Sequence, residues 1–269
     1  MKIVFILDYY YPVIGGAEVL NQKLAEALAL KHEVCVLTQQ VKNCLPYEEL
    51  NRVKIYRVPT THRALFPYQG FQLAKKLVKD ADIVQAAPYG AGILAARVRK
   101  YTQAKTILLV YEYLGRRWLK MGLNGFQAFF YERYLFQHMF DHYIAISEST
   151  KKQLLAKGIA AKQITRIYCG IDYDFFKPQP KNIALRKQLQ LKQDEFVILF
   201  AGRPGVTKGV FLLLEAMRSI QDSRFKIQRK MKFVLILAKE PAKQRREVEN
   251  MIKRYHLAEL VLVLDSVPR

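Results

Sequence analysis

The chain has 269 residues, of which 51% are hydrophobic and 25% charged, and this composition excludes extensive disorder. The formal net charge of +21 favours anionic partners, namely phosphorylated small molecules, nucleic acid or an acidic membrane surface. Three cysteines without metal-ligand spacing argue against a disulfide framework and a zinc site, and no apolar run is long enough for an export signal or a membrane span, so we expect a cytoplasmic globular protein.

Short β-rich runs alternate with longer helical patterns in the first part of the chain. This alternation, broken only between 38 and 53, predicts an α/β fold with a Rossmann-like, doubly wound parallel sheet covered on both faces. The predicted strands are 2–7, 32–38, 53–58, 81–87, 105–111, 142–147 and 163–168, and the predicted helices are 17–30, 69–79, 91–101, 125–140 and 149–157.

Two prolines, Pro178 and Pro180, then interrupt the pattern and predict a linker. We therefore predict an N-terminal domain over 1–178 and a second Rossmann-like domain over 179–269. The alternation restarts in the second domain but stops after its third strand, so we expect this domain to be incomplete and the chain to be truncated within it. Its predicted strands are 195–202, 231–238 and 260–264, and its predicted helices are 208–221 and 241–256.

Two adjacent glycines, Gly15 and Gly16, stand between the first predicted strand and the first predicted helix. Glycines at a helix N-terminus let backbone N–H groups approach an oxygen-rich ligand, and the helix dipole favours anions there. The alternative is an ordinary strand-to-helix turn, because neither GxGxxG nor GxxxxGK[ST] is present.

A second strand-loop-helix junction, "AGRPGVTKGVFLLLEAM" (201–217), carries two cations. Arg203 can engage a phosphate with two parallel N–H bonds, and Lys208 adds a compact charge at the start of the helix. Together they can neutralise a diphosphate without a metal. The alternative is a solvated loop with two cations.

These segments resemble a known family. They are similar, in order and spacing, to the successive signatures of the retaining glycosyltransferases of family 4, which have the GT-B architecture. The resemblance implies a two-domain hexosyltransferase-like enzyme that transfers a sugar from a nucleotide-sugar to an acceptor in the interdomain cleft, with retention at the anomeric carbon. The matching segments are "YYPVIGGAE" (10–18), "AISEST" (145–150), "CGIDYDFFKP" (169–178) and "GRPGVTKGVFLLLEAM" (202–217).

The resemblance implies where the donor binds. Gly15 and Gly16 would lie against the donor phosphates and the reaction centre, and Arg203 and Lys208 would bind the diphosphate leaving group. The nucleotide-sugar is a substrate, so no cofactor is expected. The family's E-x7-E element, which contacts the donor sugar and ribose, falls beyond the end of this chain.

The catalytic positions depart from the family. Where the family has a strand ending in His followed by an acid, this chain has "LLVYEYLG" (108–115), which places Tyr111 at the His position and Glu112 at the acid position. A tyrosine can still donate a hydrogen bond to a sugar hydroxyl. Tyr111 and Glu112 are therefore the candidate catalytic residues.

Two DxD triplets, 80–82 and 172–174, have the residue types of a metal site. Ordinary capping or turn roles are sufficient to explain them, because Asp82 opens a predicted strand and Asp172 belongs to the GxD signature. We predict no metal site.

The segment 115–143 interleaves basic and aromatic residues, an arrangement suited to the headgroup region of a membrane. We assign most of 126–140 to a core-facing helix and propose that 115–126 attaches reversibly to an anionic membrane. This would place the protein in the cytoplasm, peripheral on the inner face of the cell membrane, with a lipid-linked or cell-surface glycan acceptor.

Two other functions compete. A basic nucleic-acid-binding protein would fit the charge, but no RNP-type strand, KH loop or recognition helix is present, so we expect no nucleic-acid partner. A truncated, inactive remnant or fragment that binds acceptor or partner is the other alternative.

Overall fold

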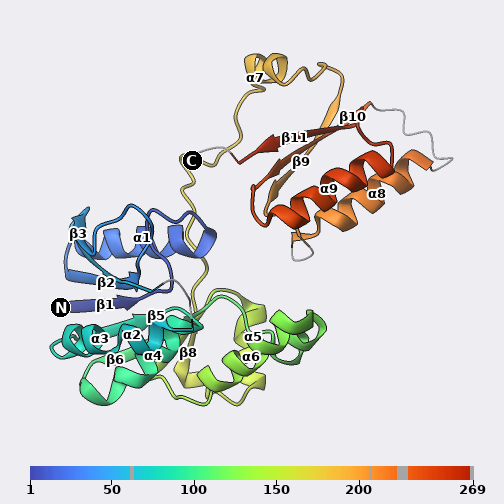
Figure 1. Ribbon diagram of the computed structural model, residues 1–269. Coiled ribbons are helices and arrows are strands. Elements are labelled where there is room, and N and C mark those ends of the chain that lie inside the picture. The colour runs from blue at the N-terminus through green and yellow to red at the C-terminus, as the bar shows by residue number, and fades with distance from the viewer. Residues whose placement is uncertain (61–63, 206–207, 223–229, 267–269) are drawn as a thin grey trace. The chain divides into compact units, whose positions relative to one another are not determined.

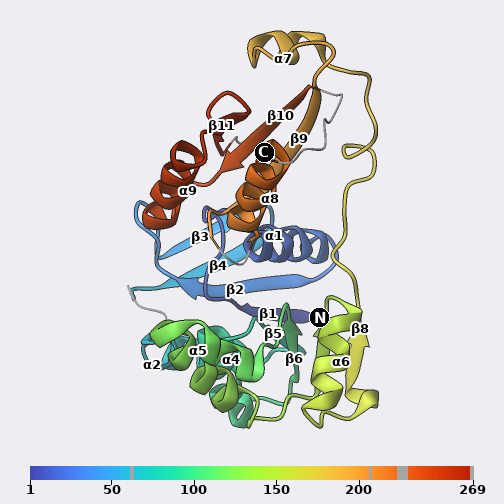
Figure 2. The same ribbon diagram turned by 90° about the vertical axis from the view of Figure 1, so that its right-hand side faces the viewer.

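The computed structural model describes residues 1–60, 64–205, 208–222 and 230–266. The chain forms two compact units, Met1–Tyr173 and Asp174–Arg269, drawn in Figures 1 and 2. The boundary predicted from Pro178 and Pro180 lies a few residues further along the chain. No helix in the described ranges combines the length and the apolar character needed to cross a bilayer.

Unit 1 contains an eight-stranded sheet in the order β3-β4-β2-β1-β5-β6-β7-β8. All neighbouring strands are parallel except β3, which pairs antiparallel with β4. The predicted α/β class with a parallel sheet is therefore confirmed. The strands are β1 (Lys2–Ile6), β2 (Glu33–Gln39), β3 (Tyr47–Leu50), β4 (Val53–Val58), β5 (Ile83–Ala86), β6 (Lys105–Val110), β7 (His142–Ala145) and β8 (Ile164–Arg166).

Helices cover both faces of this sheet (Figure 1). Helix α1 (Gly16–Ala29) lies over a core that includes Phe5, Val36 and Ile55. The other face packs a larger core under α2, α3 and α4, because successive strand residues point to opposite faces. The remaining helical elements of unit 1 are α2 (Phe66–Gln69), α3 (Phe71–Val78), α4 (Gly90–Val98), η1 (Arg99–Tyr101), η2 (Gly115–Lys120), α5 (Gly122–Leu135), α6 (Glu148–Ala156) and η3 (Ala161–Gln163).

The helix predicted over most of 126–140 packs one face on the core as expected, but it runs over Gly122–Leu135 and its other face is exposed. Leu135 and Phe136 are buried in the core, but Phe126, Phe130 and Tyr134 are exposed. The apolar residues surround α5 on all sides, so periodicity alone could not say which of them are buried.

The strand order sets the position of a ligand crevice. From β1 the chain moves outward to β2 and β4, and then returns to β5 on the other side of β1 before continuing to β8. The loops that leave β1 and β5 therefore separate in opposite directions at the centre of the sheet. In open α/β sheets, ligands bind at this point, outside the carboxyl ends of the strands.

Unit 2 has a three-stranded parallel sheet in the order β11-β10-β9. Helices α8 and α9 cover one face of it, where they pack on Phe233 and Leu235 (Figure 1). Leu199 of β9 is 63% exposed. The elements are α7 (Ile183–Gln188), β9 (Phe196–Gly202), α8 (Val210–Asp222), β10 (Met231–Leu237), α9 (Ala242–Arg254) and β11 (Val261–Asp265).

Candidate functional site

Asp8 is the first polar group at the crevice of unit 1. It lies just beyond β1 and is 6% exposed. Its Oδ1 accepts a hydrogen bond of 3.0 Å from the backbone N–H of Ala91, in the first turn of α4. An internal carboxylate therefore already occupies the positive N-terminus of α4.

The glycine pair lies at the N-terminus of α1. Gly15 is the N-cap residue, and a Cβ placed on it would stand 2.1 Å from Oε2 of Glu18. A Cβ on Gly16 would meet no atom within 4 Å in the described residues. Gly15 thus makes room for the Glu18 carboxylate, whereas Gly16 leaves space that a ligand can fill.

This difference separates the two glycines experimentally. Gly16→Ala should leave the melting temperature unchanged within about 2 °C, since the site has room and alanine favours helix. If a nucleotide-sugar approaches this turn closely, the same change should weaken its binding about tenfold. Titration calorimetry with a UDP-sugar measures the dissociation constant. Gly15→Ala is the comparison, because its methyl group would displace the Glu18 carboxylate. Unchanged binding by Gly16→Ala would contradict a close approach.

Tyr111, which follows β6, contacts α1. Its hydroxyl accepts a 2.5 Å hydrogen bond from Nδ2 of Asn21, which is itself 2% exposed. Burial raises the pKa of Tyr111 far above its usual value, and the Glu18 carboxylate adds to the rise. The phenol therefore stays neutral and can donate a hydrogen bond, but it cannot act as a general base near neutral pH.

Glu112 is exposed, and its Oε1 accepts a 3.3 Å hydrogen bond from the hydroxyl of Tyr89. The Tyr89 ring also stands edge-on to Trp118, with centroids 6.4 Å apart. Tyr89 has φ of 71° at the N-cap of α4, a backbone conformation that costs a non-glycine residue about 1–3 kcal/mol. Sequence analysis missed Tyr89; its position between Pro88 and Gly90 after a strand was the available signal.

The structure thus brings Glu18 and Tyr111 together beside the glycine pair, since the Glu18 carboxylate lies close to Gly15 and adds to the rise that burial causes in the pKa of Tyr111. The side chain of Glu112 instead contacts Tyr89 at the N-terminus of α4. The DxD aspartates of 80–82 lie elsewhere, at the amino end of β1. There the backbone N–H of Lys2 donates to Asp82 at 2.7 Å, and the Lys2 ammonium pairs with Asp80.

Arg203 and Lys208 lie in unit 2, between the carboxyl end of β9 and the start of α8. Both side chains are exposed, and neither has an ion-pair partner among the described residues. Residues 206–207 of the same motif are outside the described ranges. The two cations are therefore available to an anionic ligand.

Other cations at this edge of the sheet are already neutralised. Asp265, at the end of β11, pairs with Arg245 at 2.8 Å and with Lys239 at 3.7 Å. Arg245 also pairs with Glu249 at 3.1 Å. This contrast makes Arg203 and Lys208 the better candidates for binding a diphosphate.

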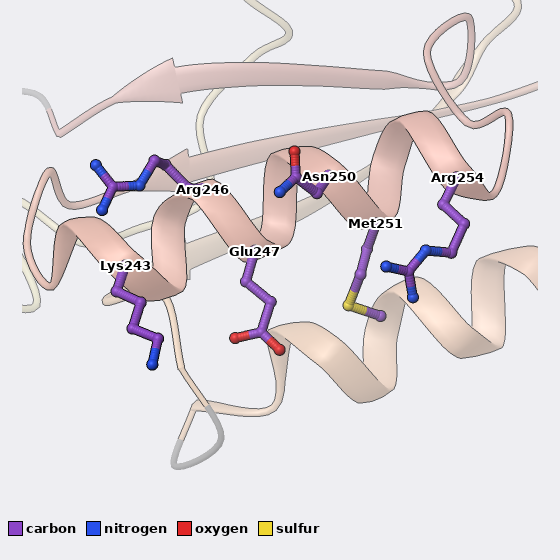
Figure 3. Close-up of a pocket in the computed structure, with 6 residues that line it drawn as sticks. All are labelled: Lys243, Arg246, Glu247, Asn250, Met251 and Arg254. Atoms are coloured by element: carbon purple, nitrogen blue, oxygen red, sulfur yellow. The ribbon is translucent and has the colours of Figure 1, made fainter.

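A groove of about 510 Å³ also runs along α9 (Figure 3). Glu247 and Met251 point from α9 toward the neighbouring helix α8. The groove lies on helix surfaces and not at the strand ends where α/β folds bind substrates. Its lining residues are Lys243, Arg246, Glu247, Asn250, Met251 and Arg254.

Known structures share this fold. The crystal structure of HepE from Anabaena in complex with UDP and glucose aligns over 100% of this chain and 70% of its own, with a TM-score of 0.76 and 19% identity. Sucrose-phosphate synthase from Thermosynechococcus elongatus aligns over 99% and 70%, with a TM-score of 0.75 and 18% identity. The fold is that of the GT-B glycosyltransferases.

Sequence comparison identifies the family. Residues 14–175 match Glycosyltransferase Family 4, and the chain belongs to this family. An uncharacterized glycosyltransferase of Methanocaldococcus jannaschii is 27% identical over 82% of this chain. The phosphatidylinositol N-acetylglucosaminyltransferase GPI3 subunit of Saccharomyces cerevisiae is 24% identical over 99% of it. The chain spans 60% and 59% of the lengths of these two relatives.

Proposed function

We propose that the protein is a hexosyltransferase-like glycosyltransferase that moves a sugar from a nucleotide-sugar to an acceptor hydroxyl with retention of configuration. The observation that carries the proposal is the Family 4 match over 14–175. The UDP and glucose bound to HepE, which shares the fold, support a nucleotide-sugar donor. Arg203 and Lys208, which have no ion-pair partner in the described ranges, supply the positive charge that the leaving diphosphate requires.

The chemistry follows from where charge develops. The bond between the sugar C1 and the phosphate oxygen breaks with its electron pair on the diphosphate. The acceptor oxygen bonds to C1 on the same face, and its proton passes to the departing diphosphate. Arg203 and Lys208 stabilise the added diphosphate charge more in the transition state than in the ground state. The carboxylates of Glu18 and Glu112 are suited to accept hydrogen bonds from sugar hydroxyls, and the neutral Tyr111 to donate one. No metal or cofactor is needed.

We further propose a lipid-linked or cell-surface glycan acceptor. A relative aligned over 99% of this chain is named as a phosphatidylinositol N-acetylglucosaminyltransferase subunit, which supports a lipid acceptor. An enzyme for such an acceptor would work in the cytoplasm, peripheral on the inner face of the cell membrane.

Loss of either cation should weaken donor binding. A hydrogen bond to a charged group contributes about 1.5–3 kcal/mol, so Arg203→Ala or Lys208→Ala should raise the Kd for UDP or a UDP-sugar roughly tenfold to a hundredfold. Titration calorimetry on the full chain measures the change. Lys239→Ala is the matched control, since Asp265 already pairs with this lysine.

Two results would contradict the proposal. Equal losses from Lys239→Ala and Arg203→Ala would mean that general charge and not a diphosphate site governs binding. A wild-type chain that binds no nucleotide and transfers no sugar would favour the alternative function, in which the protein is an inactive remnant or fragment that binds an acceptor or a partner.

A further inference from the structure

The outer face of α5 is aromatic. Phe126, Phe130 and Tyr134 are 54%, 51% and 46% exposed and follow one another at four-residue spacing, so they form one stripe. The rings of Phe126 and Phe130 are 4.8 Å apart. A helix on the surface of a globular domain normally exposes a polar face to solvent. This one exposes aromatic rings to water.

The segment that precedes α5 extends this apolar area. Leu119 and Met121 are 46% and 45% exposed. A Cβ on Gly125 would lie 2.0 Å from the carbonyl oxygen of Trp118, so the glycine allows η2 to pack directly on the first turn of α5. We call the five exposed side chains, together with the cations of η2, the η2–α5 surface: Leu119, Met121, Phe126, Phe130, Tyr134, Arg116, Arg117 and Lys120.

A buried carboxylate holds the two elements together. Glu132 of α5 is 3% exposed and accepts hydrogen bonds from the backbone N–H groups of Leu114 at 3.0 Å and Gly115 at 2.6 Å. It accepts a third from Nε1 of Trp118 at 3.0 Å. The η2–α5 surface is therefore preformed and needs little ordering on binding.

The charge on this surface has one sign. Arg116, Arg117 and Lys120 are exposed and have no ion-pair partner in the described residues. From 115 to 135 the sequence contains one acidic residue, Glu132, whose buried carboxylate already accepts hydrogen bonds from Gly115 and Trp118. Exposed aromatic rings on α5, with the cations of the contacting element η2 that lack a partner in the described part of the chain, match a headgroup region that offers phosphates and an apolar boundary.

We propose that the η2–α5 surface docks the protein reversibly on an anionic lipid bilayer. The aromatic stripe of α5 enters the boundary between headgroups and acyl chains, and the cations of η2 bind lipid phosphates. A second copy of the chain is the poorer occupant, because a two-fold interface would bring the same cations face to face. The inference names the surface behind the peripheral location given in the proposed function and rests on that part of it, but lipid docking requires no sugar transfer. It also moves the attachment site from the loop 115–126 alone to the exposed face of the following helix.

Vesicle co-sedimentation of the full chain tests the inference. The wild-type chain should bind vesicles of phosphatidylcholine with phosphatidylglycerol and should not bind phosphatidylcholine alone. Combined Phe126→Ser and Phe130→Ser should lower the partition coefficient roughly tenfold or more, because the buried apolar area is lost. Combined Arg116→Glu and Arg117→Glu should lower it to a similar extent. These side chains are exposed, so the melting temperature should not change.

Two controls distinguish binding by this surface from nonspecific hydrophobic adsorption and from an effect of net charge. Leu212→Ser removes a side chain of α8 that is 70% exposed. Combined Lys243→Glu and Arg246→Glu makes the same charge change in the α9 groove of Figure 3. Both controls should keep wild-type binding.

Several outcomes would overturn the inference. These are no binding, equal binding to both kinds of vesicle, or an equal loss in the α9 control. A dimer in solution that Phe126→Ser with Phe130→Ser dissociates would show that a second copy covers the surface. Sugar transfer assayed on the same preparation keeps the two proposals apart: docking without transfer contradicts the proposed function alone, and transfer without docking contradicts this inference alone.

Discussion

Glu132→Ala should lower the free energy of unfolding of unit 1 by about 3 kcal/mol, because it leaves two backbone N–H groups and the indole N–H without their buried acceptor. Trp118 is the only tryptophan in the chain, and it donates to this carboxylate. Its fluorescence during urea unfolding of the full chain therefore reports on the site that is changed.

Glu148→Ala is the matched control for Glu132. Glu148 pairs with Arg166 at 2.9 Å, but both side chains are more than two-fifths exposed, at 46% and 41%. The loss should stay below about 1 kcal/mol. A loss at Glu132 as small as the loss at Glu148 would contradict the anchoring role.

The pH dependence of the same site has a defined sign. Burial raises the pKa of Glu132 above its ordinary 4.5, although Trp118 and the two backbone amides oppose the rise. The native state therefore binds this proton more strongly than the unfolded state does. The resulting stabilisation is fully present below pH 4.5 and is lost as the pH rises through the raised pKa. Relative to Glu132→Gln, the wild-type protein should gain stability as the pH falls through this window. Urea titrations of both proteins at several pH values measure the difference in their free energies of unfolding. A difference that shrinks as the pH falls would contradict the prediction.

Arg57→Met should cost about 3–5 kcal/mol, the range for breaking a buried ion pair. The Arg57 side chain is fully buried, and its guanidinium pairs with Glu48 at 2.6 Å. It also donates to the carbonyl oxygens of Tyr11 at 2.9 Å and Leu45 at 3.1 Å. One side chain thus joins strand β3, the loop before it and the segment that leads to the glycine pair.

Lys54→Met, on the same strand, is the comparison for Arg57. Lys54 pairs with Glu33 at 2.9 Å, but the two side chains are 37% and 48% exposed. We expect a loss below about 1 kcal/mol from this change. Denaturant unfolding of the full chain measures the free energy of unfolding of both variants. Equal losses would contradict the role of Arg57 as the residue that joins these three segments, which we call the Arg57 clamp.

Most strands and helices could be predicted because the buried strands and amphipathic helices of a doubly wound sheet have distinct periods. Strand β3 could not, because its polar sequence, YEEL, carries no alternating apolar pattern. Its hairpin turn uses Asn51 and Arg52 at φ of 51° and 67°, and arginine is not a residue that signals such a turn. The pairing with β4 and the Arg57 clamp hold this turn in place.

The candidate site was predictable only where single segments carry it. The glycine pair and the cations Arg203 and Lys208 follow strands directly, so the sequence could point to them. The bond between Asn21 and Tyr111 joins residues 90 positions apart. Neither that contact nor the strained backbone of Tyr89 can be seen before the strands are placed side by side. The roles proposed for these residues in catalysis stay predictions.

The two ends of the sheet in unit 1 bear on how this protein meets others. One end is β3, a strand of four residues pinned by Arg57, and the other is β8, a strand of three residues. Short edge strands offer few free backbone groups on which a foreign strand can add. Edge-to-edge strand addition to the sheet of unit 1 is therefore disfavoured, in contrast to the longer edge strands β9 and β11 of unit 2.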